Sequence, residues 1–179
     1  MKILVFSDIH GRVNAAKKVV SLIEEIKPDH LFFLGDFLYN GPRNGVPDDY
    51  NGMEVADLLK PYLRIADFVK GNCDAKIDDT VLGINLPSRY EGEFNSFNCV
   101  LAHGDDLDPS FLKLKKGDIF FSGHTHIHVL EKKDDIIYVN PGSTSFPKGD
   151  NIASYAYFDM EKIEIRKLSD SSVIASMNL

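Results

Sequence analysis

The stretch Ile119-Phe120-Phe121-Ser122-Gly123-His124-Thr125-His126 joins a short apolar run to a glycine and two histidines. The apolar run is typical of a buried β-strand, and the glycine leaves room for both imidazoles at the end of that strand. A neutral imidazole is the commonest metal-binding side chain in proteins. Two histidines on one loop also occur often without a metal, so this stretch alone leaves both interpretations open.

Four other apolar runs in the chain end in polar residues that can bind a metal. They are Ile3–Phe6 before Asp8 and His10, Leu31–Leu34 before Asp36, Arg64–Val69 before Asn72, and Phe97–Leu101 before His103. If the extended backbone continues past Ser7, Asp8 and His10 point the same way. Each of these residues, taken singly, also has a structural role as the alternative to metal binding. Asp36 could cap a helix, Asn72 could shape a turn, and His103 could be hydrogen-bonded within a loop. Recurrence at five strand ends favours one shared metal site.

The first half of the chain alternates strands with helices. After Ile3–Phe6, residues Val13–Ile26 place apolar side chains at helical spacing, and Met53–Tyr62 repeats this pattern further on. Such alternation predicts a parallel sheet whose carboxyl ends meet at one edge, where functional sites form. The stretch from Asn40 to Gly52 is crowded with Gly, Pro, Asn and Asp, and it predicts an irregular loop.

The second half of the chain contains short, often alternating apolar runs separated by turn residues. We expect mostly antiparallel strands there, with a helix only around Pro109–Lys115. The expected strands are Val81–Ile84, Phe97–Leu101, Asp118–Ser122, Val129–Glu131, Ile136–Val139, Ala153–Phe158, Ile163–Leu168 and Val173–Met177. Two sheets packed face to face, with helices outside, accommodate both halves in an α/β fold. Since the 179 residues contain no linker or repeat, we expect a single domain over residues 1–179.

The composition restricts the classes of partner and compartment. A net charge of -7 gives no general attraction to nucleic acid or to an anionic membrane, so a phosphate-bearing substrate needs a local positive centre. Cys73 and Cys99 are too few for a disulfide framework. The initial apolar run meets Ser7 and Asp8 before it could serve as a signal peptide, and no apolar run approaches the roughly 20 residues of a membrane span. We therefore expect a cytoplasmic protein without a membrane or nucleic-acid partner.

Taken in order, the motifs resemble the signature of the calcineurin-like metallophosphoesterases. The matching segments are Asp8-Ile9-His10, Gly35-Asp36, Gly71-Asn72-Cys73-Asp74, His103-Gly104 and Gly123-His124-Thr125-His126. Within that superfamily, Asn40–Asn44, Asn140–Ser143 and Phe146–Gly149 also resemble segments of the YfcE-type bacterial phosphodiesterases. The resemblance therefore covers nearly the whole chain. It implies a four-layer α/β/β/α sandwich of two mixed sheets.

The resemblance also implies a site for two divalent transition-metal ions. The implied ligands are Asp8, His10, Asp36 and His126 for one ion, and Asp36, Asn72, His103 and His124 for the other, with Asp36 as the bridge. The implied activity is that of a metal-dependent phosphodiesterase or phosphoesterase, in which a hydroxide between the metals attacks a small phosphate ester. We expect Mn²⁺ first and Zn²⁺, Fe, Co²⁺ or Ni²⁺ as alternatives, because histidine-rich ligation excludes Ca²⁺ and disfavours Mg²⁺.

Three further residues are candidates for the catalytic set. Cys73 stands where many members of the superfamily carry a histidine that assists the leaving group. A thiol is a weaker hydrogen-bond donor than imidazolium. We therefore expect aryl esters to react far better than alkyl esters, with a cysteine of no specific role as the alternative. The segment Gly71-Asn72-Cys73-Asp74, which matches a motif of the superfamily, adds Asp74 as a candidate catalytic residue. Arg43 in the long loop is a candidate phosphate clamp, and a solvated loop arginine is its alternative.

Two classes of function are compatible with the fold that the resemblance implies. The alternative to an enzyme is a non-catalytic protein-interaction scaffold like Vps29, a retromer subunit that resembles these enzymes in fold but has lost part of the ligand set. All seven ligand types are present in this chain, which favours the enzyme. A homo-oligomer, either a dimer or a tetramer, is a further expectation, with the apolar antiparallel half as a candidate interface.

Overall fold

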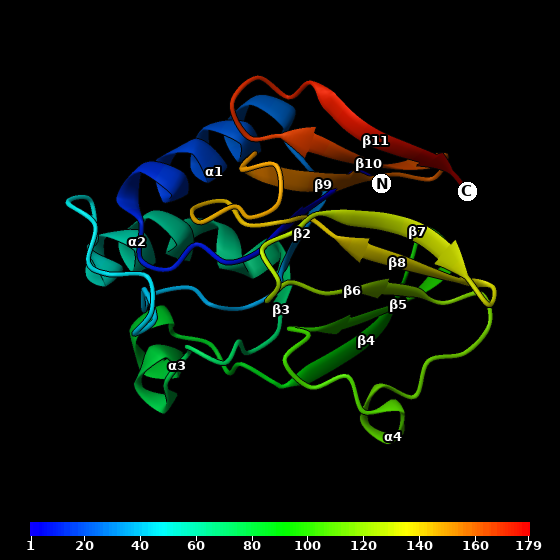
Figure 1. The fold of residues 1–179 in the computed structure, drawn as a ribbon, viewed down its shortest axis with the longest axis horizontal. Helices are drawn as coiled ribbons and strands as arrows, with labels where there is room; N and C mark the ends of the chain where they lie inside the picture. The colour runs from blue at the N-terminus through cyan, green and yellow to red at the C-terminus, as the bar shows by residue number, and fades with distance from the viewer.

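The computed structural model describes the backbone of residues 1–179 and every side chain except that of Pro109. Its strands are β1 (Ile3–Phe6), β2 (His30–Phe33), β3 (Ala66–Phe68), β4 (Arg89–Phe94), β5 (Phe97–Ala102), β6 (Ile119–Phe121), β7 (Val129–Lys133), β8 (Ile136–Asn140), β9 (Ser154–Phe158), β10 (Lys162–Lys167) and β11 (Val173–Asn178). Its helices are α1 (Val13–Ile26), α2 (Gly52–Leu59), the 3-10 helix η1 (Lys60–Ile65), α3 (Lys76–Leu82) and α4 (Pro109–Leu112). The strands form two sheets that face each other (Figure 1).

The first sheet has six strands in the order β11-β10-β9-β1-β2-β3. β1, β2 and β3 run parallel, as the alternation of strands and helices predicts, while β9 pairs antiparallel to β1. Alternate residues of β1 face opposite ways, so that Leu4 and Phe6 pack under the helices whereas Ile3 and Val5 face the second sheet. This burial on both faces explains why β1 reads as a continuous apolar run.

The second sheet has five strands in the order β4-β5-β6-β8-β7, and its pairing differs from the expectation. β5, β6 and β8 are parallel neighbours, and only the edge strands β4 and β7 pair antiparallel. The prediction of mostly antiparallel strands is therefore wrong for this sheet. Its parallel strands are connected by loops, one carrying the short α4 and the other carrying β7, so the sequence lacks the long helical pattern that marks parallel neighbours.

Two elements depart from the sequence-based expectation. Residues Val81–Ile84 do not form a strand, because Val81 and Leu82 complete α3, whose apolar side packs into the helix layer and which ends at Gly83 in a left-handed conformation. β4 has no apolar run that could announce it. It is an edge strand with Glu91 and Glu93 exposed, and charged side chains are common on such edges.

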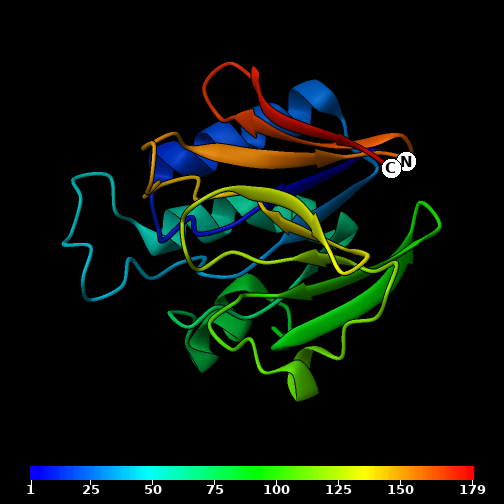
Figure 2. The same cartoon turned by 45° about the vertical axis from the view of Figure 1, so that its right-hand side comes forward.

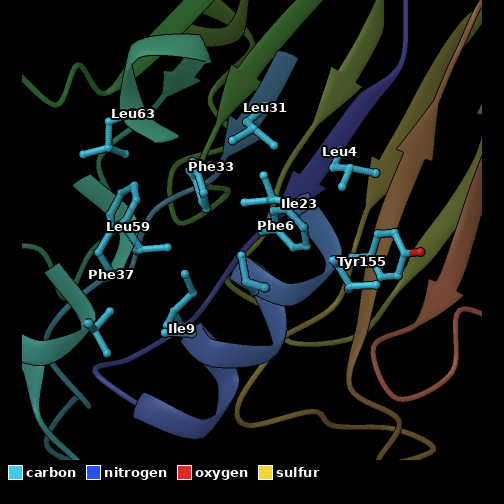
Figure 3. Packing of buried hydrophobic residues seen from close by; sticks show 14 of the residues in the cluster. Leu4, Phe6, Ile9, Ile23, Leu31, Phe33, Phe37, Leu59, Leu63 and Tyr155 are labelled. Atoms are coloured by element: carbon cyan, nitrogen blue, oxygen red, sulfur yellow. The ribbon is translucent and has the colours of Figure 1, made fainter. Parts of the chain in front are cut away.

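Three apolar cores separate the four layers. The first lies between the helices and the first sheet, where Leu4, Phe6 and Phe33 meet Ile23 of α1 and Leu59 of α2 (Figure 3). The second lies between the sheets, where the rings of Phe32 and Phe121 meet edge to face with centroids 5.3 Å apart. α4 and its loop cover part of the outer face of the second sheet and form a thin fourth layer. The four-layer α/β/β/α sandwich of two mixed sheets is confirmed.

The polar segments that follow the strands gather at one end of the molecule. The loop after β2, drawn in cyan, projects at this end, while both termini lie at the opposite end (Figures 1 and 2). Within each sheet, backbone hydrogen bonds join the ends of neighbouring strands: the N–H of Asp8 donates to Gly35 in the first sheet, and that of Gly123 donates to His103 in the second. Across the described residues, every helix is too short or too polar to cross a membrane.

Candidate metal centre

The seven predicted metal ligands all lie at this end of the sheets and face one another. Asp8 and His10 follow β1, Asp36 follows β2, Asn72 follows β3, His103 follows β5, and His124 and His126 follow β6. Both sheets therefore contribute ligands. The packing of the two sheets against each other therefore fixes the distance between the side chains that follow strands of the first sheet and those that follow strands of the second.

Five of the seven ligand residues have a left-handed backbone. Their φ angles are 56° at Asp8, 51° at His10, 57° at Asp36, 65° at His124 and 61° at His126. The extended geometry therefore does not continue past Ser7, and strand alternation is not what aims Asp8 and His10. Asp and His are enriched among the residues that adopt this strained conformation, and such strain concentrates at functional sites.

Asp8, His10 and His126 form the first group of ligand atoms. His126 Nε2 lies 3.2 Å from Asp8 Oδ1 and 3.2 Å from His10 Nε2, and the distance from His10 Nε2 to Asp8 Oδ1 is 3.6 Å. Donors bonded to one ion at about 2.1 Å are separated by about 3.0 to 3.4 Å. Asp8 Oδ1 is buried and has no hydrogen-bond partner among the described side chains and backbone. A cation at this point satisfies both the unpartnered oxygen and the two facing nitrogens.

Asn72, His103 and His124 form the second group, and Asp36 lies between the two groups. Asn72 Oδ1 lies 3.1 Å from His103 Nε2 and 2.8 Å from His124 Nδ1. Asp36 Oδ2 lies 3.4 Å from His103 Nε2 and 3.5 Å from His10 Nε2. A single carboxylate oxygen therefore faces one histidine of each group.

Three of the histidines are oriented by backbone carbonyl groups. The Nδ1 atoms of His10, His103 and His126 lie 2.9, 2.6 and 2.7 Å from the carbonyl oxygens of Tyr39, Leu34 and Phe146. Donation of Nδ1–H to these carbonyls leaves the Nε2 lone pair directed into the site, which is the tautomer that a metal ligand requires.

The two buried carboxylates are held in a comparable way. Ser7 Oγ and the backbone N–H of His124 donate to Asp8 Oδ2, at 2.6 and 3.1 Å, and the N–H of Cys73 donates to Asp36 Oδ1 at 2.8 Å. Each carboxylate thus uses one oxygen for support and turns the other toward the histidines.

The histidines and carboxylates stabilise one another's charged forms. Burial by itself raises the pKa of Asp8 and Asp36, but hydrogen bonds and charge from the neighbouring histidines lower both below the usual range. Burial lowers the pKa of His103, whereas Asp36 and Asp8 raise it, to about 9. The neighbouring carboxylates therefore favour the protonated form of His103, and a cation bound at Nε2 would compete with that proton.

The three predicted catalytic residues occupy different positions. Cys73 is half-buried, and its Sγ lies within 4.8 Å of ligand atoms of His10 and Asp36. Burial, followed by the charge of Asp36, raises the pKa of its thiol to about 12. Asp74 is buried and points away from the ligands, accepting hydrogen bonds at 2.8 Å from the backbone N–H groups of Asp36, Phe37 and Gly71. Arg43 is exposed on the loop, at the wall of the same pocket as Cys73.

A pocket of about 530 Å³ opens in front of the ligands and reveals residues to which the sequence analysis gave no role. Lys148 lines it together with Arg43, Cys73 and His124. Phe146, whose carbonyl orients His126, packs its ring edge-on against His10 with centroids 5.6 Å apart. The signal in the sequence is the segment Phe146–Gly149, which carries part of the resemblance but has no metal-binding side chain.

Known proteins resemble this chain over most of its length. The family model described as the calcineurin-like phosphoesterase superfamily domain matches residues 1–163. The phosphodiesterase YfcE of Escherichia coli is 35% identical over 99% of this chain and 97% of its own length. The phosphodiesterase MJ0936 of Methanocaldococcus jannaschii is 22% identical over 94% of this chain and 98% of its own.

Solved structures agree with these sequence matches. The structure of YfcE from E. coli, described as a phosphoesterase, superimposes with a TM-score of 0.93 at 35% identity and covers 99% of this chain and 98% of its own. A Vps29 from Entamoeba histolytica has a TM-score of 0.69 at 19% identity, covering 100% of this chain and 99% of its own, which indicates a shared fold alone. The chain belongs to the calcineurin-like phosphoesterase superfamily.

Proposed function

We propose that this protein is a phosphodiesterase that hydrolyses a small phosphate ester with the help of two divalent transition-metal ions. The observation that carries the proposal is the position of Asp36 Oδ2, 3.5 Å from His10 Nε2 and 3.4 Å from His103 Nε2. A carboxylate between two groups of nitrogen and oxygen donors is the arrangement that a dinuclear site requires. The similarity to YfcE, a phosphodiesterase, supports the same activity.

The ligand assignment follows the two groups of atoms. We assign one ion to Asp8, His10, Asp36 and His126, and the other to Asp36, Asn72, His103 and His124. Mixed nitrogen and oxygen ligation suits Mn²⁺, Fe, Co²⁺, Ni²⁺ and Zn²⁺ alike, so the availability of the metal decides among them. Mn²⁺ is the ion that we would test first.

The chemistry divides between the ions and the side chains around them. When bound, the ion pair supplies a nucleophile from water at neutral pH and positive charge for the phosphoryl oxygens. The Cys73 thiol, with a pKa of about 12, is neutral and acts as a weak hydrogen-bond donor to the leaving oxygen. Arg43 binds a phosphoryl oxygen from the pocket wall. Asp74 is a positioning residue, because its carboxylate accepts hydrogen bonds from the backbone that carries Asp36 and does not contact the substrate.

The alternative is a protein-interaction scaffold like Vps29, and metal analysis separates the two. We expect purified protein to bind about two Mn²⁺ per chain and to hydrolyse bis(p-nitrophenyl) phosphate, with loss of turnover after chelation and recovery when Mn²⁺ is restored. Asp36→Asn should lower turnover by at least a hundredfold and reduce the bound metal, whereas Asp57→Asn, which removes a surface carboxylate paired with Lys60, should change neither. A protein that binds no metal and turns over no ester would support the scaffold.

Further expectations about domain organisation, compartment, substrate and assembly belong to the same proposal. The chain acts as a single domain in the cytoplasm, on a small ester rather than on nucleic acid. It assembles as a dimer or tetramer, and the apolar groove on the outer face of the second sheet, lined by Leu112, Phe120 and Tyr138, is the candidate interface. Light scattering on the eluate of a sizing column gives the mass of the assembly, and a monomer at every concentration would contradict this part.

A further inference from the structure

The pocket in front of the ligands contains more positive charge than a simple phosphodiester needs. Two basic side chains, Arg43 and Lys148, line it in addition to the ligand histidines, and Asp36 is the one carboxylate among its described lining residues. Neither basic side chain forms an ion pair or a side-chain hydrogen bond within the part of the chain that the structure describes. Both are therefore available to an anion from solvent.

Lys148 is held at a fixed position relative to the first group of ligands. Its backbone N–H donates to the carbonyl of His126 at 3.0 Å, and two residues earlier the carbonyl of Phe146 accepts from His126 Nδ1. Ser145 Oγ donates to the carbonyl of Asp8 at 2.7 Å. The segment that carries Lys148 thus contacts two of the predicted metal ligands, so the backbone of Lys148 is fixed at the wall of the pocket.

The balance of charge indicates what kind of substrate this pocket takes. Two divalent ions, when bound, would exceed the charge of the Asp8 and Asp36 carboxylates, so they would attract a single phosphodiester anion without further cationic side chains. Arg43 and Lys148 add two positive charges in a protein whose net charge is -7, and such a local excess favours an anion with more than one negative group.

We propose that Lys148 is a specificity-determining residue that selects phosphodiesters with a second anionic group, of the phosphate class, on the ester arm that stays on the product. The proposal rests on the function proposed above and names the substrate class for the same site. A flexible lysine suits this task, because it acts as a compact point charge that can follow the second anion. Arg43 then binds the scissile phosphate group.

Two p-nitrophenyl diesters of thymidine 5′-phosphate, one with a free 3′-hydroxyl and one with a 3′-phosphate, differ only in the second anion. For Lys148→Ala we expect KM of the 3′-phosphorylated diester to rise about fivefold, with kcat unchanged and KM of the other diester altered by less than twofold. Lys148→Arg should retain the wild-type preference. Lys116→Ala is the matched control, because Lys116 is exposed and pairs with Asp135 at a turn outside the pocket.

A binding measurement separates failure of this proposal from failure of the proposed function. Calorimetry with the Mn²⁺-loaded protein should show thymidine 3′,5′-bisphosphate binding more tightly than thymidine 5′-phosphate, and Lys148→Ala should remove most of that preference. Equal effects of Lys148→Ala on both ligands, or no wild-type preference, would overturn the role of Lys148. If the bisphosphate preference depends on Lys148 but neither diester is hydrolysed with any metal, the anion site stands and the proposed hydrolase activity is refuted.

Discussion

Single residues at this site have backbone conformations that the adjoining strands exclude. Asp8, His10 and Asp36 all have φ above 50°, and each turns the chain sharply out of a parallel strand. A left-handed conformation costs an ordinary residue about 1 to 2 kcal/mol, and the tertiary contacts around each of these residues offset that strain. The side-chain chemistry of the site therefore depends on local backbone support.

Asp74 provides much of that support. Asp74→Asn replaces one acceptor oxygen by an amide group that faces backbone N–H donors, so we expect a loss of about 2 kcal/mol in the free energy of unfolding and weaker Mn²⁺ binding. Urea denaturation and metal titration measure both effects. Asp57→Asn is the control, because Asp57 is exposed and pairs with Lys60 on the surface. Unchanged stability of Asp74→Asn would show that these hydrogen bonds do not support the loop.

We propose that Cys73 limits which leaving groups the site tolerates. Because its neutral thiol donates weakly, nitrophenyl diesters should react far faster than alkyl diesters, whose leaving groups require protonation. Cys73→His should narrow that gap. The ratio of kcat/KM for a nitrophenyl and an alkyl phosphodiester, measured in both proteins, tests this directly. Equal rates on the two esters in the wild-type protein would contradict it.

Arg43 affects binding more than chemistry if it contacts the ester. It lies on the exposed loop, at the pocket wall. Arg43→Ala should raise KM for bis(p-nitrophenyl) phosphate about fivefold or more, since charge-assisted hydrogen bonds are stronger than neutral ones. The neighbouring exposed Pro42→Ala serves as the control for loop changes. A KM that does not move would remove Arg43 from the site.

At the scale of elements, the ends of β1 and β6 come from different sheets and touch at Gly123. A Cβ added to Gly123 would lie 1.9 Å from Ser7 Oγ and 2.8 Å from Asp8 Oδ2. Gly123→Ala should therefore displace Asp8 and weaken Mn²⁺ binding at least tenfold, in addition to destabilising the fold by about 1 to 3 kcal/mol. Metal titration together with denaturation measures both quantities.

Gly83→Ala provides the matched control for this contact. Gly83 ends α3 with φ of 74° and has open space around its Cα, so alanine there costs about 1 kcal/mol of backbone strain without touching the site. We expect its Mn²⁺ affinity to equal that of the wild type. If both variants lose metal to the same extent, general destabilisation and not the approach of the two strands explains the effect.

For the whole molecule, the shared core between the sheets predicts that they unfold together. Phe32 of the first sheet and Phe121 of the second are buried against each other, so neither sheet keeps its inner face covered alone. Scanning calorimetry should show one transition. Mn²⁺ at a hundred times its dissociation constant should raise Tm by about 5 to 10 °C, because it binds the folded state. Two separate transitions, or no shift with metal, would contradict this account.

The sequence by itself determined the local elements whose patterns are continuous. The apolar run of β1 and the helical spacing of α1 fix those elements at their observed bounds, since hydrophobic periodicity is a local property. It also determined which side chains end the strands, and the order of motifs identified the superfamily. Edge strand β4 and the parallel pairing of β5, β6 and β8 were missed, because edge strands carry charged residues and pairing is a long-range choice.

Only the tertiary structure decided how the site is assembled. It placed Asp36 between His10 and His103 and gave five of the predicted ligand residues a left-handed backbone. It also turned Asp74 toward the backbone and placed Lys148 at the wall of the pocket. These properties depend on contacts between residues far apart in the chain, such as that of Gly123 with Ser7. A sequence shows the chemical type of each side chain, but directions and distances arise when the two sheets pack and fix the strand ends against each other.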